Sequence, residues 1–255
     1  MSAQNIWITG ASTGIGAAVA LRLAQLGHRV AITARSEDKL AALSENLSAF
    51  KGQIFPYPGD VTDAKAMTKL VAQIEAEMGH LDMAILNAGA HFPDKSKQFS
   101  AELCRKTFDL NVQGVANCLE PILDRFRPRK AGHIAIVASV AGFRGLPSSL
   151  TYGPSKAALI NMAEALAIEC KPMDIKVQVV NPGFVKTPLT DKNDFPMPML
   201  MDVNDAARAM ADGLFSNRFE INFPRSLCYL KKAIDMLPNR AYLWVMRSVL
   251  PKVLN

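Results

Sequence analysis

Two side chains four positions apart, Tyr152 and Lys156, could exchange a proton with a substrate oxygen. They stand at the start of a helical run, so the spacing predicts that both project from one helix face. A free tyrosine has a pKa of about 10 and is a poor base at neutral pH. An adjacent ammonium favours the phenolate, so we expect Lys156 to lower the pKa of Tyr152. The pair therefore predicts an acid/base site.

A second feature with chemical potential is the glycine-rich turn Thr9-Gly10-Ala11-Ser12-Thr13-Gly14-Ile15-Gly16. Glycines permit a tight turn, so that the free N–H groups and positive dipole end of the next helix can face a pyrophosphate. A Walker-type phosphate loop is excluded because no Gly-Lys-Ser/Thr sequence follows. The turn alone leaves open a tight strand-to-helix connection without a ligand. With the other motifs, it predicts a dinucleotide site.

The elements that must position these residues are short apolar strands alternating with helical segments. The strands are predicted at residues 6–9, 30–33, 53–55, 83–86, 134–137, 177–180 and 220–223. Most are apolar throughout, which is typical of a parallel sheet covered by helices on both faces. Ligands bind beyond the carboxyl ends of such strands. Residues with chemical potential follow the strands accordingly: Gly10, Arg35, Asp60, Asn87, Ser139 and Asn181-Pro182-Gly183.

Several of these motifs resemble those of the short-chain dehydrogenase/reductase family. The turn has that family's T-G-x-x-x-G-I-G spacing, Asn87-Ala88-Gly89 matches its N-A-G motif, and Asp60-Val61 matches its adenine-contacting segment. Its catalytic set is matched by Asn111, Ser139, Tyr152 and Lys156. The resemblance extends over roughly residues 5 to 190. It implies a single doubly wound Rossmann-type domain and an oxidoreductase that interconverts a carbonyl and an alcohol.

The resemblance also implies roles for individual residues. Tyr152 would be the acid/base, Lys156 would also hold the nicotinamide ribose, Ser139 would bind the carbonyl oxygen, and Asn111 would organise a proton path. In the segment after residue 181, the backbone of Val185 and the hydroxyl of Thr187 would meet the carboxamide. The cofactor-binding set implied is Gly10, Ser12, Thr13, Gly14, Ile15, Gly16, Arg35, Ser36, Asp60, Val61, Asn87, Ala88, Gly89, Tyr152, Lys156, Pro182, Gly183, Val185 and Thr187.

The end of the second strand indicates which dinucleotide is used. An acidic residue there would accept hydrogen bonds from the ribose hydroxyls of NAD, but this chain has Ala34, Arg35 and Ser36. The planar guanidinium of Arg35 can bind the 2′-phosphate of NADP bidentately or stack on adenine. Ser12, Thr13 and Ser36 could add hydroxyl donors. The sequence therefore predicts NADP(H), with an exposed loop arginine as the alternative.

Composition narrows the class of protein. The 255 residues suit one α/β domain, and the first residues lack the basic and apolar runs of a signal peptide, which predicts a cytoplasmic protein. The four cysteines are scattered, without metal or redox spacing. Most of the net charge of +6 lies after residue 224, so the body is nearly neutral and a nucleic-acid partner is not expected.

The C-terminal segment, residues 225–255, is predicted to extend the catalytic domain of residues 1–224 as a basic, amphipathic helical pair. Its expected apolar faces are Leu227, Leu230, Ile234 and Leu237, then Tyr242, Val245, Met246, Val249 and Val253. It could cover the substrate pocket, pack on a sister subunit, or lie peripherally on the inner face of an anionic membrane. By resemblance, a homodimer or homotetramer would form through helices near residues 101–127 and 152–170.

The substrate is expected to be an apolar aldehyde, ketone or alcohol. A Pro- and Met-rich stretch, residues 188–201, resembles the family's mobile flap and suits apolar ligands of variable shape. Phe92, Phe143 and Leu146 could complete such a pocket, although core packing would explain them as well. The alternative function is a non-catalytic module that binds NADP(H) to report redox state or scaffold a partner. Loss of Tyr152 or Lys156 would favour the module, and both are present.

Overall fold

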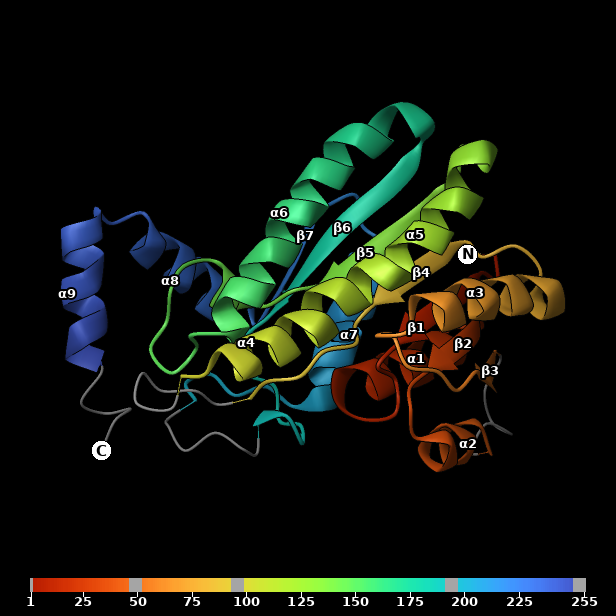
Figure 1. The fold of residues 1–255 in the computed structure, drawn as a ribbon, viewed down its shortest axis with the longest axis horizontal. Helices are drawn as coiled ribbons and strands as arrows, with labels where there is room; N and C mark the ends of the chain where they lie inside the picture. Colours follow the sequence, from red (N-terminus) through yellow and green to blue (C-terminus); the bar gives the residue numbers. More distant parts are fainter. Residues whose placement is uncertain (1, 46–51, 93–98, 191–196, 250–255) are drawn as a thin grey trace.

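The computed structural model describes residues 2–45, 52–92, 99–190 and 197–249, and these contain one seven-stranded parallel sheet (Figure 1). The spatial order of the strands is β3-β2-β1-β4-β5-β6-β7. The predicted doubly wound sheet is confirmed, and each strand contains the predicted run. The strands are β1 (Asn5–Thr9), β2 (Arg29–Thr33), β3 (Gln53–Pro56), β4 (Met83–Leu86), β5 (Gly132–Val137), β6 (Ile175–Pro182) and β7 (Glu220–Phe223).

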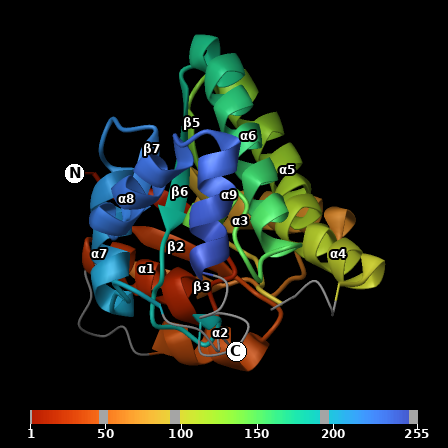
Figure 2. The same cartoon turned by 90° about the vertical axis from the view of Figure 1, so that its left-hand side faces the viewer.

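Helices cover both faces of the sheet (Figures 1 and 2). Alternate residues of β1 face opposite ways: Ile6 and Ile8 join the core beneath one layer, and Trp7 joins the core beneath the other. The first layer is α1 (Gly14–Gln25), α2 (Glu37–Glu45) and α7 (Val203–Leu214). The second is α3 (Ala64–Met78), α5 (Gly114–Arg129) and α6 (Tyr152–Cys170), with α4 (Ala101–Phe108) leading into α5.

Chain order reverses at β1, which pairs with β2 on one side and with β4 on the other. The connections after β1 and β4 therefore leave in opposite directions and open a crevice at the carboxyl edge, where α/β sheets bind ligands. The glycine-rich turn follows β1, and Asn87 follows β4. The topology thus brings together two motifs that are nearly 80 residues apart in the chain.

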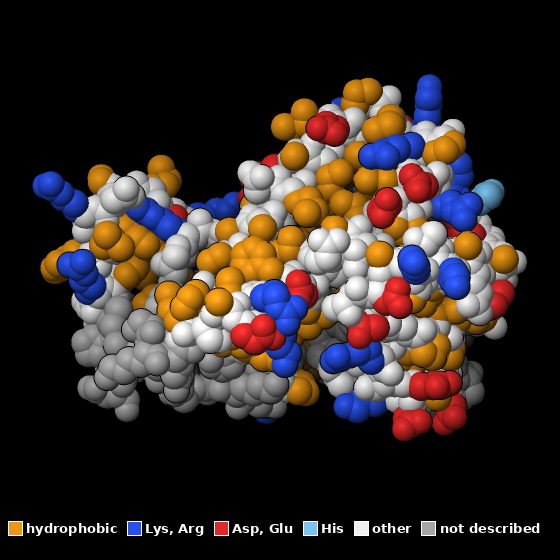
Figure 3. Space-filling view, in the orientation of Figure 1, with side chains coloured by type: hydrophobic (Ala, Val, Ile, Leu, Met, Phe, Trp, Pro, Cys, Tyr) orange, Lys and Arg blue, Asp and Glu red, His pale blue; other side chains and the backbone are white. Residues whose placement is uncertain are grey.

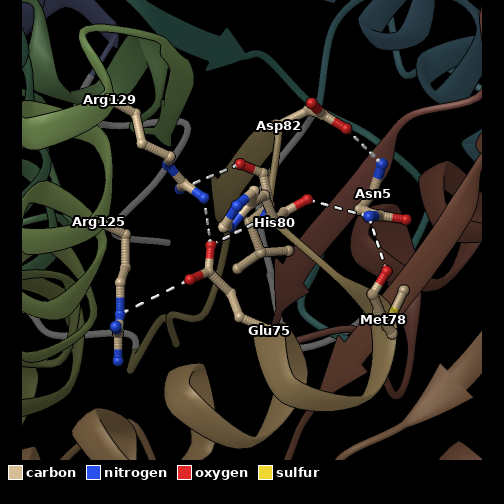
Figure 4. Close-up of polar contacts among 8 residues, drawn as sticks. Asn5, Glu75, Met78, His80, Asp82, Arg125 and Arg129 are labelled. Atoms are coloured by element: carbon tan, nitrogen blue, oxygen red, sulfur yellow. Dashed lines mark hydrogen bonds and ion pairs between the residues drawn. The ribbon is translucent and has the colours of Figure 1, made fainter.

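The opposite, amino edge of the sheet is held by a polar network (Figure 4). Asp82 accepts a hydrogen bond from the backbone N–H of Asn5 at 2.8 Å, which fixes the start of β1 beside β4. Glu75 of α3 is paired with Arg129 at 2.8 Å and with Arg125 at 3.7 Å, both on α5. These contacts tie the second helix layer to the sheet at the edge remote from the crevice.

Two helices extend the chain beyond β7: α8 (Arg225–Asp235) and α9 (Asn239–Val249). The predicted helical pair is present, but one residue of the predicted apolar face, Leu230, is wrongly placed. Leu230 is 52% exposed, whereas Cys228 and Lys231 are buried. Lys231 pairs with Asp235 one turn later, which lowers the cost of its inward position. Val249 and Val253 lie outside the described side chains, and the boundary at residue 224 stays a prediction.

Arg144, in the loop after β5, anchors this extension. Its guanidinium donates to the carbonyl oxygens of Asp235 at 2.6 Å and Leu237 at 2.7 Å. It also lies 3.9 Å from the centroid of the Tyr242 ring, whose hydroxyl donates to the Gly145 carbonyl at 2.6 Å. A cation at a helix C-terminus is favoured by the helix dipole. The extension is therefore fastened to the body beside the carboxyl edge of the sheet.

Candidate active site

Two neighbouring cavities open at the carboxyl edge of the sheet. The glycine cleft, of about 160 Å³, is lined by the turn after β1 and by residues after β4, β5 and β6. The apolar cavity, of about 300 Å³, lies between the loop after β5 and helices α8 and α9. Both are lined by Ser139, Tyr152, Gly183, Leu189 and Thr190. The shared wall is therefore where a group in one cavity could react with a group in the other.

The glycine cleft has a floor of backbone. Gly10 and Gly14 have φ values of +66° and +61°, which favour glycine. A Cβ on Gly10 would lie 2.7 Å from Ala88 Cα, and one on Gly16 would lie 2.5 Å from Asn87 Nδ2. Helix α1 begins here with no side-chain cap from Thr13 and no acidic residue in its first turn. The first N–H groups of α1 are thus available to an anionic ligand.

Asn87 and Thr9 hold this turn against β4. Asn87 Nδ2 donates to the carbonyl oxygens of Thr9 and Gly10, each at 3.0 Å. Thr9 Oγ1 accepts from the backbone N–H groups of Asn87 at 3.0 Å and Ala88 at 3.1 Å. Asn87 was a predicted site residue and lines the cleft. Thr9 begins the motif but was not among the predicted site residues, because its contacts with β4 are tertiary.

The far end of the crevice carries the residues predicted to meet the adenosine. Arg35 and Ser36 are exposed just beyond β2, and Arg35 has no carboxylate partner among the described residues. Asp60 Oδ1 accepts from the backbone N–H and the hydroxyl of Thr62, at 2.9 and 2.8 Å. The carbonyl of Val61 accepts from Asn117 at 2.9 Å. Asp60 and Val61 are therefore fixed, while Arg35 is free to meet an anion.

The reacting residues meet between the two cavities. Tyr152 is the first residue of α6, and Lys156 lies one turn further along, as the spacing predicts. Ser139 follows β5 and accepts a hydrogen bond from the backbone N–H of Ala141 at 3.1 Å. Lys156 Nζ donates to the carbonyl oxygen of Val137 at 2.8 Å and lies 5.7 Å from the centroid of the Tyr152 ring. The ring of His91 packs on Tyr152, with centroids 4.8 Å apart.

The predicted lowering of the Tyr152 pKa is wrong for the chain by itself. Burial raises the pKa of Tyr152 to about 12, and a hydrogen bond with Ser139 opposes that rise only in part. Burial also lowers the pKa of Lys156 to about 8. The ammonium of Lys156 is directed to a carbonyl oxygen instead of the phenol, so it does not offset the loss of solvation. At neutral pH Tyr152 is a phenol, the form that donates a proton.

Asn111 lies in a π-helical segment, Asp109–Gln113, between α4 and α5. Such segments are frequent at functional sites. The Asn111 amide accepts from the Ala90 N–H at 2.8 Å and donates to the Ala90 carbonyl at 3.0 Å. It also donates to Ser155 Oγ at 3.1 Å, and Ser155 in turn donates to the Tyr152 carbonyl at 2.7 Å. Asn111 therefore links the loop after Gly89 to the start of α6, and Ser155 is a link that was not predicted from the sequence.

The segment after β6 closes the glycine cleft. The Gly183 N–H donates to the Phe223 carbonyl at 2.7 Å, which places Pro182 and Gly183 beside Ser139. Thr190 Oγ1 donates to the Val185 carbonyl at 2.7 Å and accepts from the Thr187 N–H at 3.0 Å. Val185 and Thr187 line the cleft as predicted. Thr190, which shapes this turn, was not among the predicted residues.

The lining of the apolar cavity agrees only in part with the pocket predicted from the sequence. Leu146 and Leu189 line it, together with Phe184, Leu227 and Met246. Phe92 instead packs under Lys106, and Phe143 under Lys232, because each ring pairs with a cation. Phe195 lies outside the described residues. Three roles were predicted for the C-terminal helices: covering the substrate pocket, packing on a sister subunit, or lying on a membrane. In the structure, α8 and α9 form part of the wall of the apolar cavity.

Other features of the described residues are structural. All four cysteines are free thiols, and three of them, Cys118, Cys170 and Cys228, are buried. No cluster of histidine, cysteine and acidic side chains in the described ranges could hold a metal ion. None of the helices described is both long and apolar enough to cross a membrane.

A family model and several known proteins match this chain in sequence. The short chain dehydrogenase family model matches residues 4–196. A Myxococcus xanthus (strain DK1622) protein named "Uncharacterized oxidoreductase" is 37% identical over 239 residues, 94% of each chain. The 3-oxoacyl-(acyl-carrier-protein) reductase FabG of Thermotoga maritima is 32% identical over 185 residues, 72% of this chain and 75% of that protein.

Solved structures show the same fold. A short-chain dehydrogenase from Streptomyces avermitilis superposes with a TM-score of 0.81 at 26% identity, over 98% of both chains. ElxO with NADP bound superposes with a TM-score of 0.77 at 26% identity, over 87% of this chain and 98% of that one. A Tyr-to-Phe variant of ElxO with NADPH bound matches equally well.

Proposed function

This chain belongs to the short-chain dehydrogenase/reductase family of oxidoreductases, and from that premise we propose that it reduces an apolar aldehyde or ketone with NADPH. The observation that carries this proposal is the wall shared by the two cavities. Ser139 and Tyr152 line both the glycine cleft and the apolar cavity. A carbonyl held in the apolar cavity would therefore lie beside the reactive end of a nicotinamide held in the cleft.

The residues present fit a nicotinamide dinucleotide. A backbone cradle that a single Cβ at Gly10 or Gly16 would fill, beside an uncapped helix N-terminus, suits a pyrophosphate. Arg35 and Ser36 would hold a 2′-phosphate, and Asp60 and Val61 would meet the adenine. ElxO, which shares the fold, binds NADP and NADPH. When bound, NADPH supplies the hydride.

The chain's own residues would supply the proton and the positioning. Tyr152, a phenol at neutral pH, donates its proton to the carbonyl oxygen as the alcohol forms. Ser139 donates a hydrogen bond to the same oxygen, and Lys156 holds the nicotinamide ribose and supplies positive charge. Val185 and Thr187 hold the carboxamide. Asn111 fixes the start of α6 and, with it, the position of Tyr152.

A carbonyl panel tests the proposed reaction. Purified protein is incubated with NADPH, and separately with NADH, and with apolar, aromatic and charged-sugar carbonyls, and the loss of reduced cofactor is followed by absorbance. We expect turnover with NADPH and apolar carbonyls. Tight NADPH binding with no turnover of any compound would instead support the binding-module alternative.

We also propose self-association through the face formed by α4, α5 and α6. Hydrophobic side chains gather over this face (Figure 3), and Ile168 of α6 is 76% exposed. A homodimer or homotetramer would cover them. Light scattering of the eluted protein should give a multiple of the chain mass, and Ile168→Glu should shift it toward the monomer.

Peripheral membrane contact of residues 225–255 stays a prediction, which co-sedimentation with anionic vesicles would test.

A further inference from the structure

We infer that the substrate carries a carboxylate remote from its reactive carbonyl, and that Lys231 of α8 binds this carboxylate inside the apolar cavity. The inference rests on the proposed carbonyl reduction and names its substrate class: apolar oxo acids. It starts from the contrast within the cavity wall. Lys231 is the only lysine, arginine or acidic residue among the described lining residues, and the others are mainly aliphatic, aromatic or small.

Lys231 is turned inward at a cost that packing does not explain. Its residue is only 8% exposed, whereas its neighbours Tyr229 and Leu230 are 63% and 52% exposed. A rotation of α8 that buried Leu230 would put an apolar side chain in place of the ammonium. Burying an ammonium is unfavourable unless the charge is compensated. The orientation of α8 therefore supports a binding role for the Lys231 ammonium in this wall.

The compensation within the chain is incomplete. Lys231 pairs with Asp235, and Arg144 lies on the same aromatic ring, Tyr242, with centroid distances of 5.4 Å for Lys231 and 3.9 Å for Arg144. Arg144 donates to backbone carbonyl oxygens and to Asn239, not to the Asp235 carboxylate. Arg144 therefore adds a second positive charge beside Lys231 without pairing with the Asp235 carboxylate. The neighbouring Lys232 adds no unpaired positive charge, because it pairs with Glu220.

Lys231 also retains hydrogen-bonding capacity. An ammonium has three N–H donors, and the only acceptor for Lys231 among the described residues is Asp235 Oδ1. Burial and the nearby Arg144 lower the pKa of Lys231, and an anion beside it would favour the charged form. A cation with free donors, at a wall shared with apolar side chains, matches an aliphatic or aromatic chain that ends in a carboxylate.

The groups proposed to bind the carbonyl and the carboxylate line the same cavity. Ser139 and Tyr152 line it from the body of the domain, and Lys231 lines it from α8. A substrate that spans the cavity would present its carbonyl to Tyr152 and its carboxylate to Lys231. A volume of about 300 Å³ is at the small end of ligand sites.

The test compares straight-chain oxo acids of graded length with their methyl esters, which keep the carbonyl and the chain but remove the charge. For wild-type protein, kcat/KM with NADPH should be about 10- to 100-fold higher for the best acid than for its ester, the range of a hydrogen bond to a charged group. Lys231→Met should remove this preference by lowering the acid value. Lys231→Arg should retain it, and so should the control Lys232→Met, whose side chain lies outside the cavity wall.

Each outcome decides the inference. Equal kcat/KM for acids and esters in the wild type would overturn it while leaving carbonyl reduction intact, and that result needs no variant to fold. A preference that survives in Lys231→Met would also overturn the role of Lys231. If neither acids nor esters nor neutral carbonyls are turned over, the proposed function fails and the inference fails with it.

Discussion

Replacing Tyr152 with phenylalanine should lower kcat/KM for carbonyl reduction by about 10²- to 10⁴-fold, the contribution typical of general acid catalysis. The change removes one hydroxyl and keeps the ring that packs on His91 and lines both cavities. The fold and the cavity shapes should therefore be preserved, and NADPH should still bind. Reduction rates and NADPH affinity, measured on the same preparations, separate loss of the proton donor from loss of the cofactor.

The matched control is Tyr229→Phe, because Tyr229 lies on the exposed face of α8. It removes a phenol hydroxyl that lines neither cavity and should leave kcat/KM unchanged. A Tyr152→Phe variant that keeps more than about a tenth of wild-type activity would mean that another group or water supplies the proton.

Replacing Arg35 with glutamate should reverse the cofactor preference. Arg35 lies exposed beyond β2, without a carboxylate partner among the described residues. Loss of a charge-assisted bond to the 2′-phosphate should lower kcat/KM for NADPH by about 10- to 100-fold, and repulsion by the new carboxylate should lower it further. The same carboxylate can accept hydrogen bonds from the ribose of NADH. Steady-state kinetics with each cofactor measure both changes.

Arg218→Glu is the control for this change of charge, because Arg218 is also exposed but precedes β7, at the amino edge of the sheet. Its cofactor preference should equal that of the wild type. An Arg35→Glu variant with an unaltered ratio of NADPH to NADH efficiency would show that Arg35 does not contact the phosphate.

The sequence was sufficient to predict the frame of the site because the frame depends on local patterns. Apolar β-branched runs predicted the parallel strands, and the rule that ligands bind at their carboxyl ends predicted that Gly10, Asn87 and Ser139 lie together. The structure confirms the sheet and places most of the predicted residues around one cleft. Their roles in catalysis and cofactor binding remain proposals.

What the sequence could not predict depends on tertiary contacts. Thr9 accepts hydrogen bonds from backbone N–H groups 78 and 79 residues away, and Ser155 accepts one from the side chain of Asn111. Thr190 donates to the Val185 carbonyl within a turn. The direction of the Tyr152 pKa shift follows from the burial of the Tyr152 side chain and from the carbonyl oxygen to which Lys156 donates. Periodicity also assigned Leu230 to the buried face of α8, because hydrophobicity alone cannot anticipate an inward lysine balanced by Asp235.

Hydride transfer can be tested directly with NADPH that carries deuterium at both C4 positions of the nicotinamide and an apolar ketone as the substrate. If the chain reduces the ketone, mass spectrometry will show deuterium on the carbinol carbon of the alcohol formed by wild-type protein. The Tyr152→Phe variant should form little alcohol. An alcohol without the label, or no alcohol from protein that binds NADPH tightly, would contradict reduction at the wall shared by the two cavities.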